Sequence, residues 1–139
     1  MNITVMGTGY VGLVTGATLS DIGHKVTCLD IIESKVNELN QGKSPIFEPG
    51  LEELIQSGIK NKTLAGSIDI ENCIRESDVT FVCVGTPSNK DGSIDLNYIK
   101  SASSSIGRAL RAKEGNHTVI VKSTVVPLTT EKTVLPIVL

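Results

Sequence analysis

Along the chain, short apolar runs of strand length alternate with segments whose apolar residues recur at helical spacing. Short apolar runs of strand length occupy residues 2–6, 25–29, 79–84 and 118–121, and a weaker run occupies residues 63–66. Between these runs apolar residues recur at helical spacing, which predicts helices over residues 10–22, 32–40, 51–56, 69–76 and 96–111, and a last one starting near residue 127. This alternation is typical of an open parallel sheet with right-handed helical connections.

Length and burial pattern narrow the fold class further. Residues 79–84 are apolar almost throughout, as expected of a strand that is covered on both faces of a parallel sheet. With 139 residues the chain has the length of one domain with one core. The expected fold class is therefore α/β, a Rossmann-type doubly wound parallel sheet in a single domain.

Charge and hydropathy exclude several classes of function. The 13 Lys and Arg residues nearly balance the 15 Asp and Glu residues, and no basic patch supports binding to nucleic acid. No apolar run approaches the roughly 20 residues that a membrane-spanning helix needs. The first residues lack the basic start of a signal peptide, so we expect a cytoplasmic protein. Residues 133–139 carry no charge, which predicts that the chain is cut from a longer protein.

Cysteine and histidine show no pattern of a disulfide framework or a metal site. The three cysteines are an odd number and form no Cys-x-x-Cys pair. Cys28 and Cys83 lie in apolar strand runs and are expected to pack as small core residues. His24 and His117 have no second ligand nearby and are interpreted as surface turn residues.

The clearest chemical signal is a glycine pattern directly after the first predicted strand. Gly7, Gly9 and Gly12 have the spacing Gly-x-Gly-x-x-Gly, and Tyr10 and Val11 lie at the start of the helix that follows. In this context the first glycine allows a tight turn, the second lets a pyrophosphate approach the backbone, and the third allows close packing of the helix. Free amide groups at the helix start would then hold the anion. An unliganded turn is the alternative interpretation.

An acidic residue at the end of the second strand indicates which dinucleotide is bound. Asp30 lies 18 residues after Gly12, where a carboxylate can accept from both hydroxyls of the adenosine ribose and repels a 2′-phosphate. Lys35 favours NADP instead, because an ammonium group can pair with the 2′-phosphate. The alternative interpretation is that Lys35 is an exposed lysine on the helix surface. Since the carboxylate lies closest to the ribose, we expect NAD rather than NADP.

Two further loops follow strands at the same edge of the sheet. Thr86 comes after the strand at residues 79–84, and Ser123 and Thr124 come after the strand at residues 118–121. Ligands of doubly wound sheets bind beyond the carboxyl ends of the strands. Small hydroxylated residues there leave space and hydrogen bonds for a ribose and a nicotinamide. Ordinary loop polarity is the alternative for each loop taken alone.

These motifs resemble one known family. Gly-Thr-Gly-Tyr-Val-Gly (7–12), Phe-Glu-Pro-Gly-Leu (47–51), Gly-Thr-Pro (85–87) and Lys-Ser-Thr-Val (122–125) occur in the order seen in the amino-terminal domain of the UDP-glucose/GDP-mannose dehydrogenase family. The resemblance spans essentially the whole chain. It implies that Thr124 also helps to place the water of a hydrolytic step, and that NAD is contacted by Val11, Asp30, Lys35, Thr86 and Thr124.

The resemblance also implies an activity that needs more than this chain. The family oxidises the C6 alcohol of a nucleotide sugar to the acid with two NAD, through a cysteine in a Gly-x-Cys-x-Pro-Lys motif that none of the three cysteines matches. Residues 1–139 are therefore expected to be an NAD-binding domain, truncated before the central helix, the sugar-nucleotide domain and the catalytic cysteine, and inactive alone. The parent is expected to be a homo-oligomer acting on UDP-glucose, with GDP-mannose and UDP-N-acetylmannosamine as alternatives.

One alternative belongs to another class of protein, a free-standing NAD-sensing regulatory module. Such a module also needs the glycine loop and the ribose acid. Thr86 and Thr124 argue against such a module, because their hydroxyls are placed to bind the nicotinamide half of the cofactor, where a hydride would be transferred. One position departs from the family pattern: Leu128 stands where many relatives have glycine, which bears on where the last helix starts.

Overall fold

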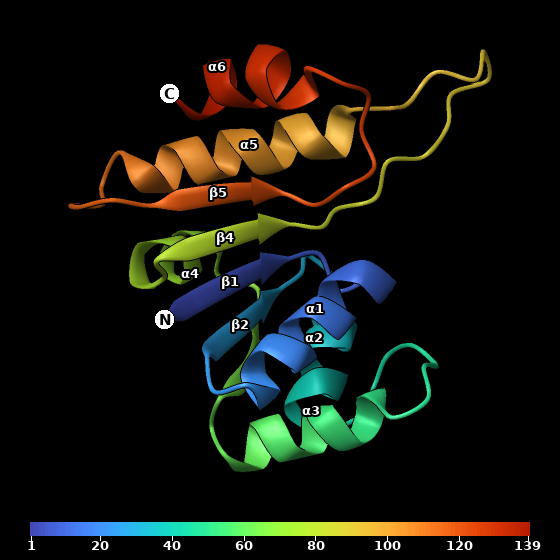
Figure 1. The fold of residues 1–139 in the computed structure, drawn as a ribbon, viewed down its shortest axis with the longest axis vertical. Helices are drawn as coiled ribbons and strands as arrows, with labels where there is room; N and C mark the ends of the chain where they lie inside the picture. The colour runs from blue at the N-terminus through green and yellow to red at the C-terminus, as the bar shows by residue number, and fades with distance from the viewer.

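The computed structural model describes all residues 1–139 and contains one five-stranded parallel sheet with the order β3-β2-β1-β4-β5. The strands are β1 (Asn2–Met6), β2 (Lys25–Leu29), β3 (Leu64–Ser67), β4 (Val79–Val82) and β5 (Thr118–Val121). The helices are α1 (Tyr10–Asp21), α2 (Glu33–Asn40), α3 (Leu51–Lys60), α4 (Ile70–Glu76), α5 (Asn97–Leu110), a π-helical turn η1 (Thr130–Val134) and α6 (Leu135–Val138). The arrowheads of β1, β4 and β5 point to the same side, where the carboxyl ends of the strands meet (Figure 1).

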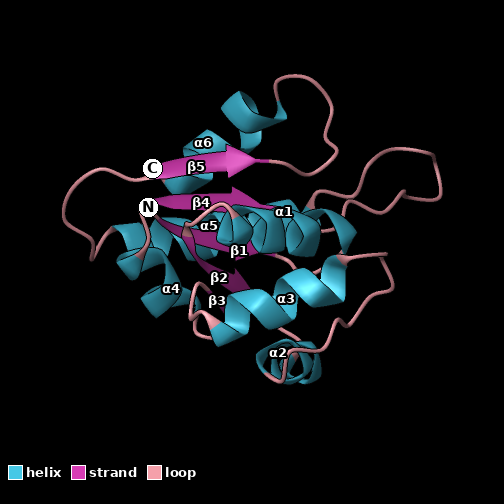
Figure 2. Ribbon diagram, turned by 60° about the horizontal axis from the view of Figure 1, so that its bottom comes forward, coloured by secondary structure: helices cyan, strands magenta, loops and turns pink.

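Two hydrophobic clusters sandwich the sheet, as the doubly wound prediction requires. Alternate side chains of β1 divide between them: Ile3 and Val5 pack with α1, α2 and α3, whereas Met6 packs with α4 and α5. Figure 2 shows the strands stacked from β5 to β3 with the helices placed around them. The predicted α/β class, the parallel sheet and the strand–helix order are confirmed. None of the helices combines the length and apolar character needed to cross a membrane.

Several helix boundaries differ from the prediction for identifiable reasons. Helix α3 runs on to Lys60 through Ser57 and Gly58, a pair that usually ends helices. A Cβ at Gly58 would lie 2.7 Å from Leu64 Cβ, so the missing side chain lets α3 approach β3. Helix α5 starts at Asn97, one residue later than predicted, and the Asp95 carboxylate accepts from the Asn97 amide at 2.8 Å.

The last helical segment begins later than the predicted start near Pro127. Leu128 has φ +70°, a left-handed conformation that cannot continue into a right-handed helix, so the helical turn begins at Thr130. Leucine in this conformation costs about 1 kcal/mol or more. Glycine, which the family resemblance led us to expect at this position, adopts a positive φ without strain.

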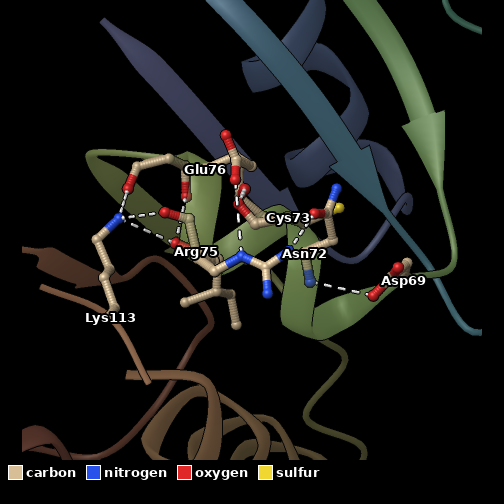
Figure 3. A network of polar contacts seen from close by, with 9 residues as sticks. Asp69, Asn72, Cys73, Arg75, Glu76 and Lys113 are labelled. Carbon is tan, nitrogen blue, oxygen red and sulfur yellow. Dashed lines mark hydrogen bonds and ion pairs between the residues drawn. The ribbon is translucent and has the colours of Figure 1, made fainter. Parts of the chain in front are cut away.

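Lys113 covers the carboxyl end of α4 (Figure 3). Its Nζ donates to the carbonyl oxygens of Arg75 at 2.8 Å and Ile74 at 3.2 Å, and also to that of Ser77. A cation is favourable at this end of a helix, where carbonyl groups lack partners within the helix. The contact therefore ties the loop after α5 to α4.

His117 belongs to the same region and is not the surface turn residue that the sequence predicted. Its Nδ1 donates to the Ser77 carbonyl at 3.0 Å, and its Nε2 lies 2.9 Å from Thr80 Oγ1. Because a carbonyl can only accept, Nδ1 carries the proton of the neutral ring, and Thr80 donates to Nε2. Burial, followed by the nearby Lys113 ammonium, lowers the pKa of His117 below its usual value.

We therefore expect the free energy of unfolding to fall at acidic pH, because His117 takes up a proton more readily in the unfolded chain than in the folded protein. In the unfolded state His117 takes up a proton near its ordinary pKa of about 6.5, whereas the folded protein resists protonation until a lower pH. The His117 contribution to the free energy of unfolding is thus complete above about pH 6.5 and declines below it.

Urea denaturation at several pH values between about 5 and 7 measures this dependence. His117→Asn keeps a donor for the Ser77 carbonyl but removes the titration, so its stability should vary less with pH than that of the original protein. His24→Asn, which replaces the other histidine of the chain in the same way, is the matched comparison. A slope unchanged in His117→Asn would contradict the assignment.

Candidate functional site

A cleft of about 600 Å³ lies beyond the carboxyl ends of β1, β2, β4 and β5. It is the region where ligands of doubly wound sheets bind. The structure brings together in its lining all but one of the residues selected from the sequence: Gly7, Gly9, Tyr10, Val11, Asp30, Lys35, Thr86 and Thr124. Gly12 is the exception, because it lies behind the loop and does not line the cleft.

The three glycines of the motif, two in the loop between β1 and α1 and one in the first turn of α1, meet different steric demands. Gly7 has φ +101°, and a Cβ there would lie 2.7 Å from the Cys83 carbonyl oxygen. A Cβ at Gly12 would lie 1.8 Å from the Gly7 carbonyl oxygen, so Gly12 packs against the loop itself. A Cβ at Gly9 would meet nothing within 4 Å, so the protein alone does not require glycine at that position. A ligand close to the backbone is the remaining physical reason for Gly9.

The amino end of α1 offers unpaired donors to the cleft. The amides of Tyr10, Val11 and Gly12 have no backbone acceptor, and the first hydrogen bond of the helix runs from Leu13 N to Gly9 O at 2.9 Å. No acidic side chain lies in the first turn of α1, and Gly9 provides no capping side chain. Free amides together with the positive end of the helix dipole are suited to hold a phosphate group.

Asp30 lies directly after β2 and faces the glycine loop. Its Oδ2 accepts from the Thr8 amide at 2.8 Å and from the Thr8 hydroxyl at 2.5 Å, and its Oδ1 accepts from the Ile32 amide at 3.0 Å. Partial burial is the largest single influence and raises the pKa of Asp30, but these hydrogen bonds and the Lys35 ammonium outweigh it. The pKa is therefore below its usual value, and Asp30 is ionised at neutral pH.

Lys35 is a cleft residue rather than a lysine on the solvent face of its helix. It is half-buried, lines the cleft and lies close enough to Asp30 to lower the pKa of that carboxyl. Its ammonium group therefore partly offsets the negative charge of Asp30.

The loops after β4 and β5 form the opposite side of the cleft. Thr86 is half-buried and Thr124 is exposed, and both line the cleft. The Ser123 hydroxyl, which the sequence suggested as a second ligand group, instead donates to the Val84 carbonyl at 2.6 Å. Ser123 thus joins the loop after β5 to the end of β4.

The cysteines are packing residues in the structure. Cys28 and Cys83 are buried in the cluster that contains α1. Burial raises the pKa of the Cys28 thiol to about 12 and that of the Cys83 thiol to about 11. Both thiols are therefore protonated at neutral pH, unlike the thiolate that a nucleophilic cysteine needs.

Sequence reasoning missed one wall of the cleft, which comes from α5. Tyr98, Ser101, Ala102 and Ser105 recur at the i, i+3, i+4, i+7 spacing of one helix face and line the cleft. A row of small and polar residues at helical spacing was the available signal. It did not distinguish a cleft wall from a solvent-exposed helix face. Thr8 was also missed, because it occupies a variable position of the glycine motif.

Fold and site together define a class of protein. A parallel sheet, a glycine loop leading into a helix with free amides, and a carboxylate after β2 are the features of a Rossmann-type dinucleotide-binding domain. The sequence pattern of the UDP-glucose/GDP-mannose dehydrogenase family, NAD binding domain, matches residues 1–139. The chain belongs to this family and is its NAD-binding domain.

Relatives and solved structures agree with this assignment. GDP-mannose 6-dehydrogenase of Pseudomonas aeruginosa is 47% identical over 138 residues, which is 99% of this chain and 32% of that protein. A UDP-glucose 6-dehydrogenase of Bacillus subtilis is 45% identical over 136 residues, covering 98% of this chain and 29% of that protein. The structure of a ternary complex of the Pseudomonas aeruginosa GDP-mannose dehydrogenase superposes with a TM-score of 0.98, at 47% identity, and covers 99% of this chain and 32% of that one. The chain thus spans about a third of the length of these relatives.

Proposed function

We propose that the chain is the cofactor domain of an NAD-dependent nucleotide-sugar 6-dehydrogenase, with the sugar-nucleotide site and the nucleophilic cysteine supplied by residues outside 1–139. The observation that carries the proposal is the juxtaposition, in one cleft, of the free α1 amides and the ionised Asp30 carboxylate. The amides would hold the pyrophosphate and Asp30 the adenosine ribose. When bound, NAD supplies the hydride acceptor for oxidation of an alcohol.

The remaining residues take roles that fit their positions in the cleft. Thr86 and Thr124 lie across the cleft from Asp30 and would hold the nicotinamide half of NAD. Thr124 would also help to place the water of the hydrolytic step. Lys35 would moderate the charge of Asp30 without cancelling it, because the carboxylate lies directly after β2 and is held there by three hydrogen bonds.

Calorimetric titration of the 139-residue chain with NAD, NADP and ADP-ribose tests this proposal. We expect NAD to bind at least about tenfold more tightly than NADP, because the Asp30 carboxylate repels a 2′-phosphate. We also expect NAD to bind more tightly than ADP-ribose if Thr86 and Thr124 contact the nicotinamide. Equal affinities for NAD and ADP-ribose would instead favour a sensing module, and absence of NAD binding would contradict the proposed site.

Of the three candidate substrates of the whole enzyme, UDP-glucose, GDP-mannose and UDP-N-acetylmannosamine, the first two are the best supported. The motifs of the chain suggest UDP-glucose, whereas the slightly higher identity to a GDP-mannose 6-dehydrogenase, 47% against 45%, favours GDP-mannose. In either case the chain alone is expected to form no NADH, since the proposed sugar-nucleotide site lies outside residues 1–139 and all three cysteines of the chain are buried. NADH formation by the longer protein with each sugar nucleotide decides between them. We further propose a homo-oligomeric enzyme in the cytoplasm, where free cysteines stay reduced.

A further inference from the structure

We propose that Thr8 is a positioning residue that holds the Asp30 carboxylate in its ribose-binding orientation and thereby sets the preference for NAD over NADP. The proposal rests on the role proposed for Asp30 above. Thr8 occupies the first variable position of the glycine motif, between Gly7 and Gly9. Its side chain donates to the carboxylate, and it does not need to contact the cofactor itself.

The backbone of the glycine loop places Thr8 beside Asp30. The Gly7 amide donates to the Leu29 carbonyl at 2.8 Å, which joins the end of β1 to the end of β2. Because Gly7 has φ +101°, the chain turns there, and the next residue faces the one that follows Leu29. Thr8 is only 1% exposed, so its hydroxyl is shielded from water that could replace the Asp30 bond.

The contact is directional and uses only one oxygen of the carboxylate. The Thr8 amide and hydroxyl both donate to Oδ2, at 2.8 and 2.5 Å, whereas Oδ1 accepts only from the Ile32 amide. A carboxylate offers about four acceptor positions, two on each oxygen. Thr8 therefore fills Oδ2 and leaves Oδ1 with a position to accept from a ribose hydroxyl.

Holding the carboxylate in place has consequences for both affinity and discrimination. A carboxylate that is already oriented loses less conformational freedom when the ribose binds. A carboxylate that cannot rotate away also keeps its negative charge close to the site of a 2′-phosphate. The nearby Lys35 would favour that phosphate, so discrimination depends on Asp30 staying where Thr8 holds it.

Thr8→Val tests the proposal, because valine keeps the branched shape and the backbone amide but removes the hydroxyl donor. We expect NAD affinity to fall about tenfold and the ratio of NAD to NADP affinity to fall with it. The loss of NAD affinity on acidification should begin at a higher pH in Thr8→Val, because the hydroxyl bond favours the ionised carboxylate. Thr8→Ser keeps the hydroxyl and should restore all three properties.

The controls separate this inference from the proposed function. Asp30→Asn removes the carboxylate, so it should lose both NAD affinity and the acid-dependent loss of binding. If Asp30→Asn binds NAD more weakly than the original chain, but Thr8→Val matches the original in affinity, cofactor ratio and pH profile, the role of Thr8 is wrong while that of Asp30 stands. If the original chain fails to bind NAD, the proposed function itself is wrong. The urea midpoint of each variant shows whether a loss of binding reflects unfolding. If Thr8→Ser loses NAD affinity as Thr8→Val does, the role of the hydroxyl is also wrong.

Discussion

Replacing Gly12 with alanine is expected to lower the free energy of unfolding by about 3–5 kcal/mol and to abolish NAD binding. The added Cβ would lie 1.8 Å from the Gly7 carbonyl oxygen, and both partners are backbone or directly attached to it. Neither can move without displacing the start of α1 or the turn after β1. The gain in helix propensity on replacing glycine with alanine is only about 1 kcal/mol and cannot offset this clash.

Gly9→Ala is the matched control, since it makes the same chemical change three residues earlier. No atom lies within 4 Å of the Cβ that would be added, and Gly9 has φ −75°, which alanine adopts freely. Its free energy of unfolding should stay within about 0.5 kcal/mol of the original, while its NAD affinity should fall at least about tenfold as the methyl group displaces the pyrophosphate. Urea denaturation followed by circular dichroism, with calorimetric titration, measures both quantities. Equal stability of the two variants would contradict the steric role of Gly12.

Asp30→Asn is expected to weaken NAD binding by about 10- to 100-fold, because hydrogen bonds to a charged acceptor are worth about 1.5–3 kcal/mol. NADP binding should weaken much less, since the substitution also removes the repulsion of the 2′-phosphate. Asparagine keeps one acceptor oxygen for the Thr8 or Ile32 donors, so the fold should be preserved better than in an alanine variant.

Asp21→Asn removes the same charge from the last residue of α1, which is exposed and does not line the cleft. It should leave both affinities unchanged. Calorimetric titration of the two variants with NAD and NADP measures the difference. An Asp30→Asn variant that keeps the original ratio of NAD to NADP affinity would show that another group selects the cofactor.

Most of the fold followed from local patterns, because strands and helices leave their periods in short stretches of chain. The predicted helix boundaries were wrong where close packing or backbone conformation, neither of which the apolar pattern reports, decided where the helix ends or starts. Helix α3 continues through Gly58 to Lys60, and the missing side chain at Gly58 leaves room for Leu64 of β3 to pack against the helix. The last helix starts late because Leu128 adopts a positive φ, which no pattern of apolar residues reports.

The candidate site divides in the same way. Sequence by itself determined the glycine spacing, the acid after the second strand and the threonines after the fourth and fifth, because each follows the end of a strand and parallel strands end at one edge. The tertiary structure alone decided what those residues touch. It placed Gly12 against the Gly7 carbonyl and bonded Thr8 to Asp30.

The tertiary structure also decided which other groups share the cleft. It brought the Ser101 and Ser105 face of α5 to its wall and used the Ser123 hydroxyl to join two loops. Away from the cleft, it placed the half-buried His117 against Ser77 and Thr80. The physical reason is common to all of these contacts. They join residues separated by many positions in the chain, and such contacts exist only once the sheet has brought the strand ends together.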